Sequence, residues 1–290
     1  MNEEVYQVGK MFPTAESENY VICVTNHSQV PFTVQMTNEI PEVAVGGRAG
    51  QCFPFYFYNE DGSNRRENIS DWALAQFKEK YEGGRMKDEV NAKDSSVIIH
   101  PSSLTKWDIF YYVYALLHSP AYREKYAANL KRDLPHIPFV DSVEKFWQYV
   151  EAGKKLAELH VNYEQQAEYP LEMVENPSAR LDWRVEKMKL VKPTISQPPQ
   201  NSKSGNLEDG YAIVYNDFLT LRGIPAEAFE YRLGNRSALD WVIDQYRVTE
   251  DKRSKIVNDP NDSDDPQYIV RLVRKLVTVS VETVRIVKGL

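Results

Sequence analysis

The sequence is poor in the residues from which metal sites and disulfide frameworks are built. Its 290 residues include two cysteines, Cys23 and Cys52, which are not in a C-x-x-C pair and cannot form a four-ligand zinc site by themselves. Two buried free thiols are expected, with a disulfide between them as the alternative. The five histidines are scattered, with no His-x-x-x-His pair. The residue supply therefore gives no support to a zinc domain.

The sequence also lacks the loops that mark several enzyme classes. It has no lysine-containing phosphate loop for ATP, no Gly-x-Ser-x-Gly elbow, and no Asn/Asp-Pro-Pro-aromatic loop for a flipped adenine. The glycines of 46–50 follow no strand-to-helix entry, so they predict a turn. Residues 258–261, Asn-Asp-Pro-Asn, have one proline and no aromatic residue, and they also predict a turn. No catalytic motif is recognised in this chain.

Long apolar runs and an excess of positive charge are missing as well. No run approaches the roughly 20 residues of a membrane span, and the acidic start, residues 1–4, has no secretory pattern. We therefore expect a cytoplasmic protein with no membrane partner. The net charge of −7 argues against a protein that coats DNA through bulk charge, although a local basic face remains compatible with it.

The residue patterns predict an α+β fold with mixed β-strands at both ends around a central helical bundle. Strands are expected at residues 20–25, 51–58, 183–191, 211–216 and 218–221. Helices are expected at residues 70–81, 106–118, 120–132, 141–163 and 236–248, with a last helix capped by Asp265-Pro266. Residues 277–287 fit either the end of that helix or a strand.

Three segments follow from this pattern. They are a β-rich part at residues 1–68, a helical part at 69–180 and an α+β part at 181–290. Asp141 and Glu144 have the spacing of a capping box that would start the helix at 141. The polar stretches 83–103 and 192–209 predict loops. The length allows one large domain or two small ones.

Several short sequence motifs, called phrases here, occur along the chain in an order that is specific to one family. Near the C-terminus they are Leu219–Pro225, Arg236–Tyr246 and Ile256–Asp262, and earlier ones lie at 18–22, 50–54, 68–74, 106–114, 117–123 and 134–139. Together they resemble the C-terminal specificity region, or target recognition domain, of Type ISP restriction-modification enzymes. Members of that family are single-chain helicase-methyltransferase fusion proteins that seek a DNA sequence, methylate an adenine, and otherwise translocate and cut.

The resemblance implies that this chain reads double-stranded DNA and carries no catalysis. Its implied partners are the DNA duplex and the methyltransferase domain of the same parent chain, with the duplex gripped between the two. S-adenosylmethionine, ATP and Mg²⁺ are expected only in the other domains of the parent. By the same resemblance, the chain looks like a C-terminal piece that starts just after the methyltransferase.

Three basic clusters are the candidate DNA contacts, because lysine and arginine position phosphates while polar side chains reach base edges. The first contains Arg180, Arg184, Lys187, Lys189, Lys192 and Lys203, beside a loop with Gln197 and Asn201; the second contains Arg247, Lys252, Arg253 and Lys255; the third contains Asn64, Arg65 and Arg66. Base readout is assigned to the less patterned loops 60–67, 82–104 and 192–206. Residues that read different sites should vary between relatives.

Other functions remain open at this point. The region could dock the methyltransferase without binding DNA independently. A metal-dependent hydrolase could use the crowded acidic residues Asp259, Asp262, Asp264 and Asp265, although an acidic turn that caps the last helix fits them better. A protein-binding module of unrelated function would suit the negative net charge.

Overall fold

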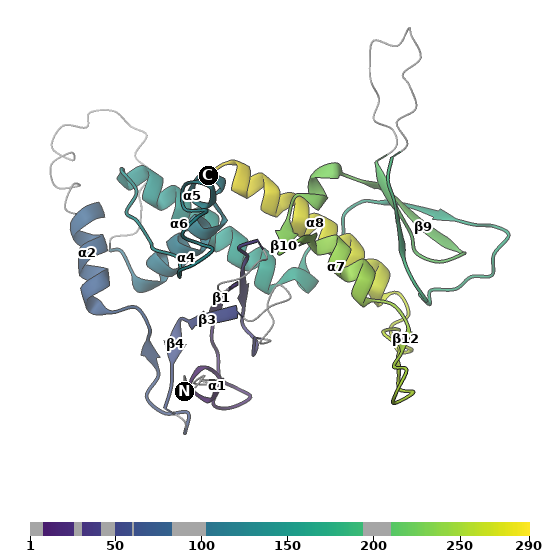
Figure 1. Cartoon of the computed structure of the whole chain (residues 1–290), viewed down its shortest axis with the longest axis horizontal. Coiled ribbons are helices and arrows are strands. Elements are labelled where there is room, and N and C mark those ends of the chain that lie inside the picture. The colour runs from purple at the N-terminus through teal and green to yellow at the C-terminus, as the bar shows by residue number, and fades with distance from the viewer. Residues whose placement is uncertain (1–7, 26–30, 42–49, 60, 83–102, 194–209) are drawn as a thin grey trace, which may run out of the picture. The chain divides into compact units, whose positions relative to one another are not determined.

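A computed structural model describes residues 8–25, 31–41, 50–59, 61–82, 103–193 and 210–290 (Figure 1). The chain forms two compact units, one of residues Met1–Val161 with Ile286–Leu290 and one of residues Asn162–Arg285. Each has its own hydrophobic core. The mixture of helices and small antiparallel sheets confirms the predicted α+β class. The division at residues 68 and 180 stays a prediction.

A three-stranded antiparallel sheet of order β2-β1-β3 lies in the first unit. Its strands are Val21–Thr25 (β1), Val34–Thr37 (β2) and Gly50–Pro54 (β3), and the short helix Val8–Met11 (α1) precedes them. Alternate residues of β1 serve two cores: Ile22 and Val24 join the larger one, and Val21 and Cys23 pack with Met11. Both sides of β1 are therefore buried.

The strand predicted at 51–58 is interrupted at Phe55, whose side chain is fully buried. After it, Tyr56–Phe57 (β4) pairs with Arg66–Glu67 (β5) in a separate ribbon. The amide of Phe55 donates to the carbonyl of Tyr20 at 2.7 Å, and its carbonyl accepts from the amide of Asn68 at 2.7 Å. The chain thus changes partner at Phe55, which a local alternation of residues does not reveal.

The described residues of this unit also form the helices Asp71–Tyr81 (α2), Lys106–His118 (α4), Pro120–Lys125 (α5) and Val143–Val161 (α6). The predictions for α2 and α4 are confirmed within one residue. A capping box between Thr105 and Asp108 fixes the start of α4. Helices α4 and α6 approach closely at Gly153, where an added Cβ would lie 2.0 Å from the carbonyl oxygen of Tyr111.

Two helix-end predictions were wrong. Helix α5 ends at Lys125 and not near residue 132, because Tyr126 has ψ 17° and the chain continues in turns. The start predicted for the next helix, with Asp141 as its cap, is also displaced by one residue. Instead the hydroxyl of Ser142 accepts the amide of Lys145 at 3.2 Å, and α6 begins at Val143.

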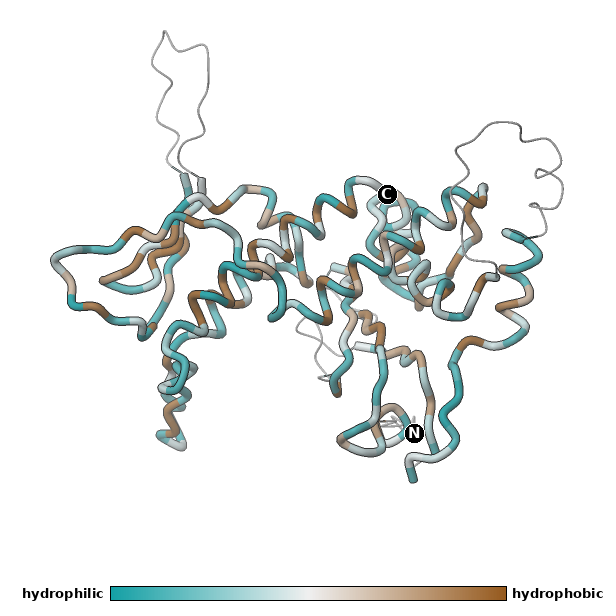
Figure 2. Tube along the Cα trace, turned by 180° about the vertical axis from the view of Figure 1, so that it is seen from behind, coloured by the Kyte–Doolittle hydropathy of each residue, from teal (hydrophilic) through white to brown (hydrophobic). Residues whose placement is uncertain are grey.

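The second unit is built on a four-stranded antiparallel sheet of order β6-β9-β8-β7. Its strands are Glu172–Glu175 (β6), Lys189–Val191 (β7), Tyr211–Val214 (β8) and Leu219–Ile224 (β9), with 3₁₀ turns at Tyr163–Gln165 and Ala226–Phe229. Ile213 and Leu221 lie opposite each other in the register and are fully buried. Hydrophobic residues follow these strands in Figure 2.

Two helices pack in the core of this unit, Ala238–Gln245 (α7) and the part of Tyr268–Lys288 (α8) that ends at Arg285. The segment 277–287, left open by the sequence, is therefore helix. Helix α7 starts two residues later than predicted, because Arg236–Ser237 (β11) first pairs with Arg232–Leu233 (β10). None of the helices within the described ranges has the length and apolarity of a membrane span.

The strand predicted at 183–191 is regular only in β7. Residues 181–188 run without strand pairing and are called the connector below. A second two-stranded ribbon, Thr249–Glu250 (β12) with Val257–Asn258 (β13), leaves the end of α7 and returns toward α8 (Figure 1). This β12–β13 ribbon, residues 249–258, was not predicted from the sequence.

Candidate nucleic-acid interface

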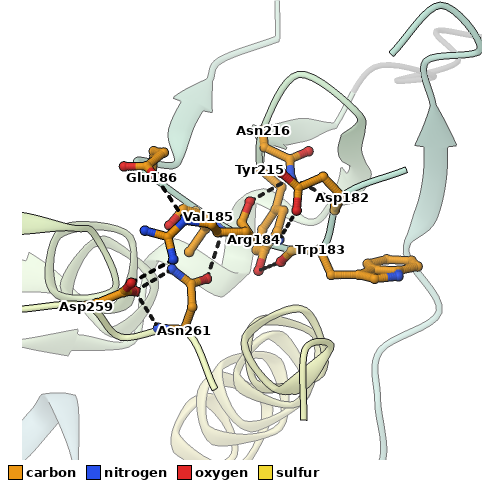
Figure 3. A network of polar contacts seen from close by, with 9 residues as sticks. All are labelled: Asp182, Trp183, Arg184, Val185, Glu186, Tyr215, Asn216, Asp259 and Asn261. Atoms are coloured by element: carbon orange, nitrogen blue, oxygen red, sulfur yellow. Dashed lines mark hydrogen bonds and ion pairs between the residues drawn. The ribbon is translucent and has the colours of Figure 1, made fainter. Parts of the chain in front are cut away.

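The connector is held in place by side chains of the β8–β9 turn rather than by strand pairing. The side-chain amide nitrogen, Nδ2, of Asn216 donates to the backbone carbonyls of Asp182 at 2.9 Å and Arg184 at 2.8 Å (Figure 3). Its side-chain oxygen, Oδ1, accepts hydrogen bonds from the backbone amides of Phe218 and Leu219 at 3.0 and 2.8 Å. One asparagine therefore shapes the turn and fixes the path of the connector.

Buried groups reinforce this path. The hydroxyl of Tyr215 donates to the carbonyl of Trp183 at 2.8 Å, and the side chain of Val185 is fully buried. Burial, with a further contribution from the nearby carboxylate of Asp182, raises the pKa of Tyr215. The hydroxyl therefore stays protonated at neutral pH and remains a donor. The connector is thus a fixed element whose charged side chains project from a defined backbone.

The base of the β12–β13 ribbon is fastened to the connector. Asn261 donates to the carbonyl of Val185 at 2.8 Å and accepts its amide at 2.8 Å, as two strand residues would do (Figure 3). On the other side of the ribbon, the amide of Val248 donates to the carbonyl of Glu186 at 3.0 Å. Both chain ends of the ribbon are therefore tied to adjacent connector residues.

An ion pair joins the same two elements. Arg184 donates to Asp259 at 2.6 Å and to Glu186 at 3.0 Å. Hydrogen bonds from the side chain and backbone of Asn261, followed by the bond from Arg184, lower the pKa of Asp259 to about 2. The carboxylate is therefore charged at neutral pH, and its ion pair with Arg184 holds the base of the ribbon against the connector.

Asp244 pairs with Arg247 of the second basic cluster and with Arg236, which belongs to none of the three clusters. Its carboxylate accepts Arg236 at 2.9 Å and Arg247 at 3.2 Å. Its pKa is lowered mainly by Arg236, with smaller effects from Arg247 and Lys187. The structure thus brings together cations that lie about 60 positions apart in sequence. Arg236 belongs to this group and was missed, because nothing local distinguishes it from a solvated arginine.

The remaining predicted contacts of these clusters are placed as follows. Lys189 and Lys192 are exposed in and after β7, and Lys252 and Arg253 are exposed in the ribbon. Gln197, Asn201 and Lys203 lie outside the residues that the structure describes. In the third cluster, which belongs to the first unit, Arg65 lies over the ring of Tyr56 at 4.5 Å and Arg66 is exposed in β5. Their roles as DNA contacts stay predictions.

Two hollows flank the connector within the second unit. One has a volume of about 730 Å³, and its lining includes Arg180, Lys187 and Asn216. The other has a volume of about 540 Å³ and is lined by residues that include Trp183 and Asp262. Both are open to solvent and lined by a mixture of polar and apolar groups, unlike the enclosed pockets that hold small molecules. Neither hollow therefore has the form of a small-molecule site.

The acidic residues near 259–265 do not converge on a metal site. Asp259 is bound to Arg184 and Asn261, Asp265 pairs with Arg271, and Asp262 accepts the amide of Asp264 at 2.8 Å. Across the described ranges, no three His, Cys, Asp or Glu residues gather as possible metal ligands. The carboxylates therefore act in turns and ion pairs, and the hydrolase alternative is not favoured.

Residues 1–272 match the family described as the Type ISP C-terminal specificity domain. The chain belongs to this family. The resemblance to Type ISP enzymes that the sequence suggested is thus confirmed over nearly the whole chain. No curated protein sequence matches the chain.

Solved structures, two of them of Type ISP enzymes, show the same fold. A nuclease-deletion mutant of LlaGI in complex with a DNA substrate mimic is 32% identical, with a TM-score of 0.71 over 98% of this chain. A DrdV–DNA complex is 34% identical, with a TM-score of 0.76 over 98% of this chain. ATP-dependent LlaBIII bound to DNA is 30% identical, with a TM-score of 0.74 over 99%. This chain spans 22%, 26% and 17% of those proteins.

Proposed function

We propose that this chain is the target recognition part of a Type ISP restriction-modification enzyme and binds double-stranded DNA in a sequence-specific way. The observation that carries the proposal is the match of 98–99% of the chain to three solved proteins, each of which is in complex with DNA or a DNA mimic. Identities of 30–34% over that length extend well beyond a shared fold.

The surface of the second unit supports this role. The connector, strand β7 and the ribbon place Lys187, Lys189, Lys252 and Arg253 on fixed backbone, although the chain is acidic overall. Local cations on such a frame can neutralise phosphates and set the register of the protein on the duplex. The negative total charge would limit binding elsewhere, which favours discrimination over bulk affinity.

The proposal extends to the parent protein. This chain would be combined with a methyltransferase that modifies adenine and with an ATP-dependent motor and nuclease. S-adenosylmethionine, ATP and Mg²⁺ would be bound by those parts, and the whole protein would act in the cytoplasm. Chemistry on a base inside a duplex requires that the base be flipped out. A recognition domain beside the methyltransferase would select which adenine is presented.

A selection from random DNA tests the proposal. The 290-residue chain is mixed with duplexes that contain a randomised central segment, at about 50 mM and about 200 mM salt, and the retained duplexes are sequenced. We expect enrichment of one short asymmetric motif that persists at the higher salt. A chain with Lys252→Gln and Arg253→Gln provides a first comparison for the contribution of exposed cations.

Two results would contradict the proposal. Retention without enrichment, lost as salt rises, would mean that the chain contacts phosphates only. No retention at either salt would favour the docking role, in which the chain mainly positions the methyltransferase.

A further inference from the structure

We infer that the β12–β13 ribbon enters the major groove of the DNA and contacts base edges there. The inference rests on the proposed function and deepens it by naming the element that reads the sequence. It replaces the sequence-based assignment of base readout to the loops 60–67, 82–104 and 192–206, and it places two of the contacts, Ile256 and Val257, inside the family phrase Ile256–Asp262.

Within the part of the chain that the structure describes, the ribbon is left exposed along its whole length. Every residue from Thr249 to Asp259 is exposed, and the two strands pair only with each other. Val257 in β13 and Ile256, which directly precedes this strand, are 57% and 68% exposed. Two neighbouring apolar side chains of the ribbon therefore meet solvent. In Figure 2 the ribbon is mostly hydrophilic, with a short hydrophobic segment near its tip.

Such a ribbon would be marginal by itself, because an isolated two-stranded hairpin has little intrinsic stability in water. Here its base is held by Asn261 on Val185, by Val248 on Glu186 and by the Arg184–Asp259 ion pair. An element that reads a groove requires a rigid base and exposed strands, and the ribbon has both. Contacts made from a fixed frame lose less conformational entropy on binding.

The tip is shaped by its own hydrogen bonds. The carboxylate of Asp251 accepts the amides of Arg253 at 3.0 Å and Ser254 at 2.7 Å, and Lys255 adopts a left-handed φ of 60°. Lys255 also pairs with Glu250 at 3.2 Å, whereas Lys252 and Arg253 project from the turn as exposed side chains. The two cations therefore project from a defined turn.

The chemistry of the ribbon fits the major groove. That groove, about 12 Å wide, admits a two-stranded β-ribbon and presents base acceptors and the thymine methyl group. Arginine and lysine bind the O6 and N7 acceptors of guanine, and apolar side chains contact the methyl group. Arg253 and Lys252 supply the first kind of contact, and Ile256 and Val257 supply the second. Phosphate binding alone would leave the exposed apolar pair without a partner.

The test is a comparison of three proteins on two forms of one DNA. The proteins are the wild-type chain, the ribbon variant Lys252→Gln/Arg253→Gln, and the matched variant Lys131→Gln/Arg132→Gln, which removes an exposed Lys-Arg pair elsewhere. The DNA probe is the most enriched duplex from the random pool. Its second form carries 7-deazapurines, which lack the N7 acceptor that every base pair presents in the major groove.

Wild type and the Lys131→Gln/Arg132→Gln variant should lose about tenfold or more in affinity for the 7-deazapurine form, the size expected for one good base contact. The ribbon variant should bind the ordinary form about tenfold more weakly and discriminate between the two forms by less than about threefold. Ile256→Ala/Val257→Ala should change the sequences enriched from the random pool, with normal thermal unfolding, because both side chains are exposed.

Different failures have different meanings. If wild type selects a motif but the ribbon variant keeps the full 7-deazapurine penalty, the ribbon inference is overturned and the proposed function stands. If the ribbon variant and the Lys131→Gln/Arg132→Gln variant lose the same affinity on both forms, the ribbon supplies charge only and the inference is again overturned. If wild type binds no DNA, the proposed function fails and the ribbon inference fails with it.

Discussion

Asn261 binds both backbone groups of Val185, which lies 76 residues earlier in the chain. The two hydrogen bonds are each 2.8 Å long and imitate the pairing of neighbouring strand residues. A side chain thus completes the connector where no strand is available. This contact links the segment that carries the first basic cluster to the ribbon that carries the second.

Replacing Asn261 by alanine should loosen the base of the ribbon. The change leaves the buried amide and carbonyl of Val185 without partners, which costs about 1–3 kcal/mol. Urea denaturation measures the free energy of unfolding, and hydrogen exchange measures protection of residues 249–258. The control is Asn258→Ala, at an exposed ribbon position, which should change stability by less than about 0.5 kcal/mol. Equal effects from the two variants would contradict this account of the base.

Gly153→Ala should be strongly destabilising, because its new methyl group would lie 2.0 Å from the carbonyl oxygen of Tyr111. Helices α4 and α6 would have to separate, at a cost of about 3 kcal/mol or more. Gly9→Ala is the matched control, since its Cβ would meet nothing within 4 Å. Thermal unfolding of both variants checks the prediction. A Gly153→Ala protein as stable as Gly9→Ala would show that the helices do not approach this closely.

The elements that the sequence predicts well are those whose signals are local. Helix α4 was predicted at its observed bounds, because its apolar stripe is continuous and Ser119-Pro120 marks its end. The strand expected at 183–191 failed for the opposite reason. Its path depends on Asn216, Tyr215 and Asn261, which lie 32 to 76 residues away. No alternation within the segment could reveal those partners.

The candidate site was predictable in part for the same reason. Clusters of lysine and arginine can be seen in the sequence, so Lys187, Lys252 and Arg253 were named in advance. Whether a cation is engaged within the protein depends on the fold. Arg184 was predicted as a DNA contact, yet the structure shows its guanidinium bound to Asp259 and Glu186. Short exposed strands such as those of the ribbon have no buried face and hence no hydrophobic alternation to detect.

Stability should fall as the pH drops below about 6.5. Burial lowers the pKa of His160 to about 3, and burial, with Arg123 and His160 nearby, lowers that of His118 well below its usual value. Within the described residues, Nε2 of His118 has no hydrogen-bond partner. Between the folded and unfolded pKa values the unfolded chain binds more protons, so acid favours unfolding. Each imidazole contributes up to about 1.4 kcal/mol per pH unit.

The measurement is urea denaturation of wild type and of His118→Leu at pH 7, 6 and 5. The variant should lose less stability than wild type between pH 7 and 5, because one buried group no longer competes for a proton. Exposed His136 offers the control: His136→Gln should retain the wild-type slope. A flat wild-type profile over this range would contradict the burial of both imidazoles as uncharged groups.

The two thiols should differ in reactivity. Cys23 and Cys52 are free, lie opposite each other on β1 and β3, and have their sulfur atoms 3.3 Å apart. The hydrogen bond with Cys52, together with burial, raises the pKa of Cys23. Brief treatment of the folded chain with iodoacetamide should therefore alkylate half-buried Cys52 before Cys23, because the thiolate is the reactive form. Peptide mass spectrometry measures this, and preferential labelling of Cys23 would contradict the burial of that side chain.

The central claim is that this chain discriminates between DNA sequences, and an affinity ratio tests it most directly. Equilibrium binding is measured for the enriched duplex and for a duplex of the same composition in shuffled order, at about 150 mM salt. The account predicts a ratio of dissociation constants of about 10³ or more, as in specific protein–DNA recognition. A ratio near one would contradict it, because the chain would then hold the phosphate backbone without reading the bases.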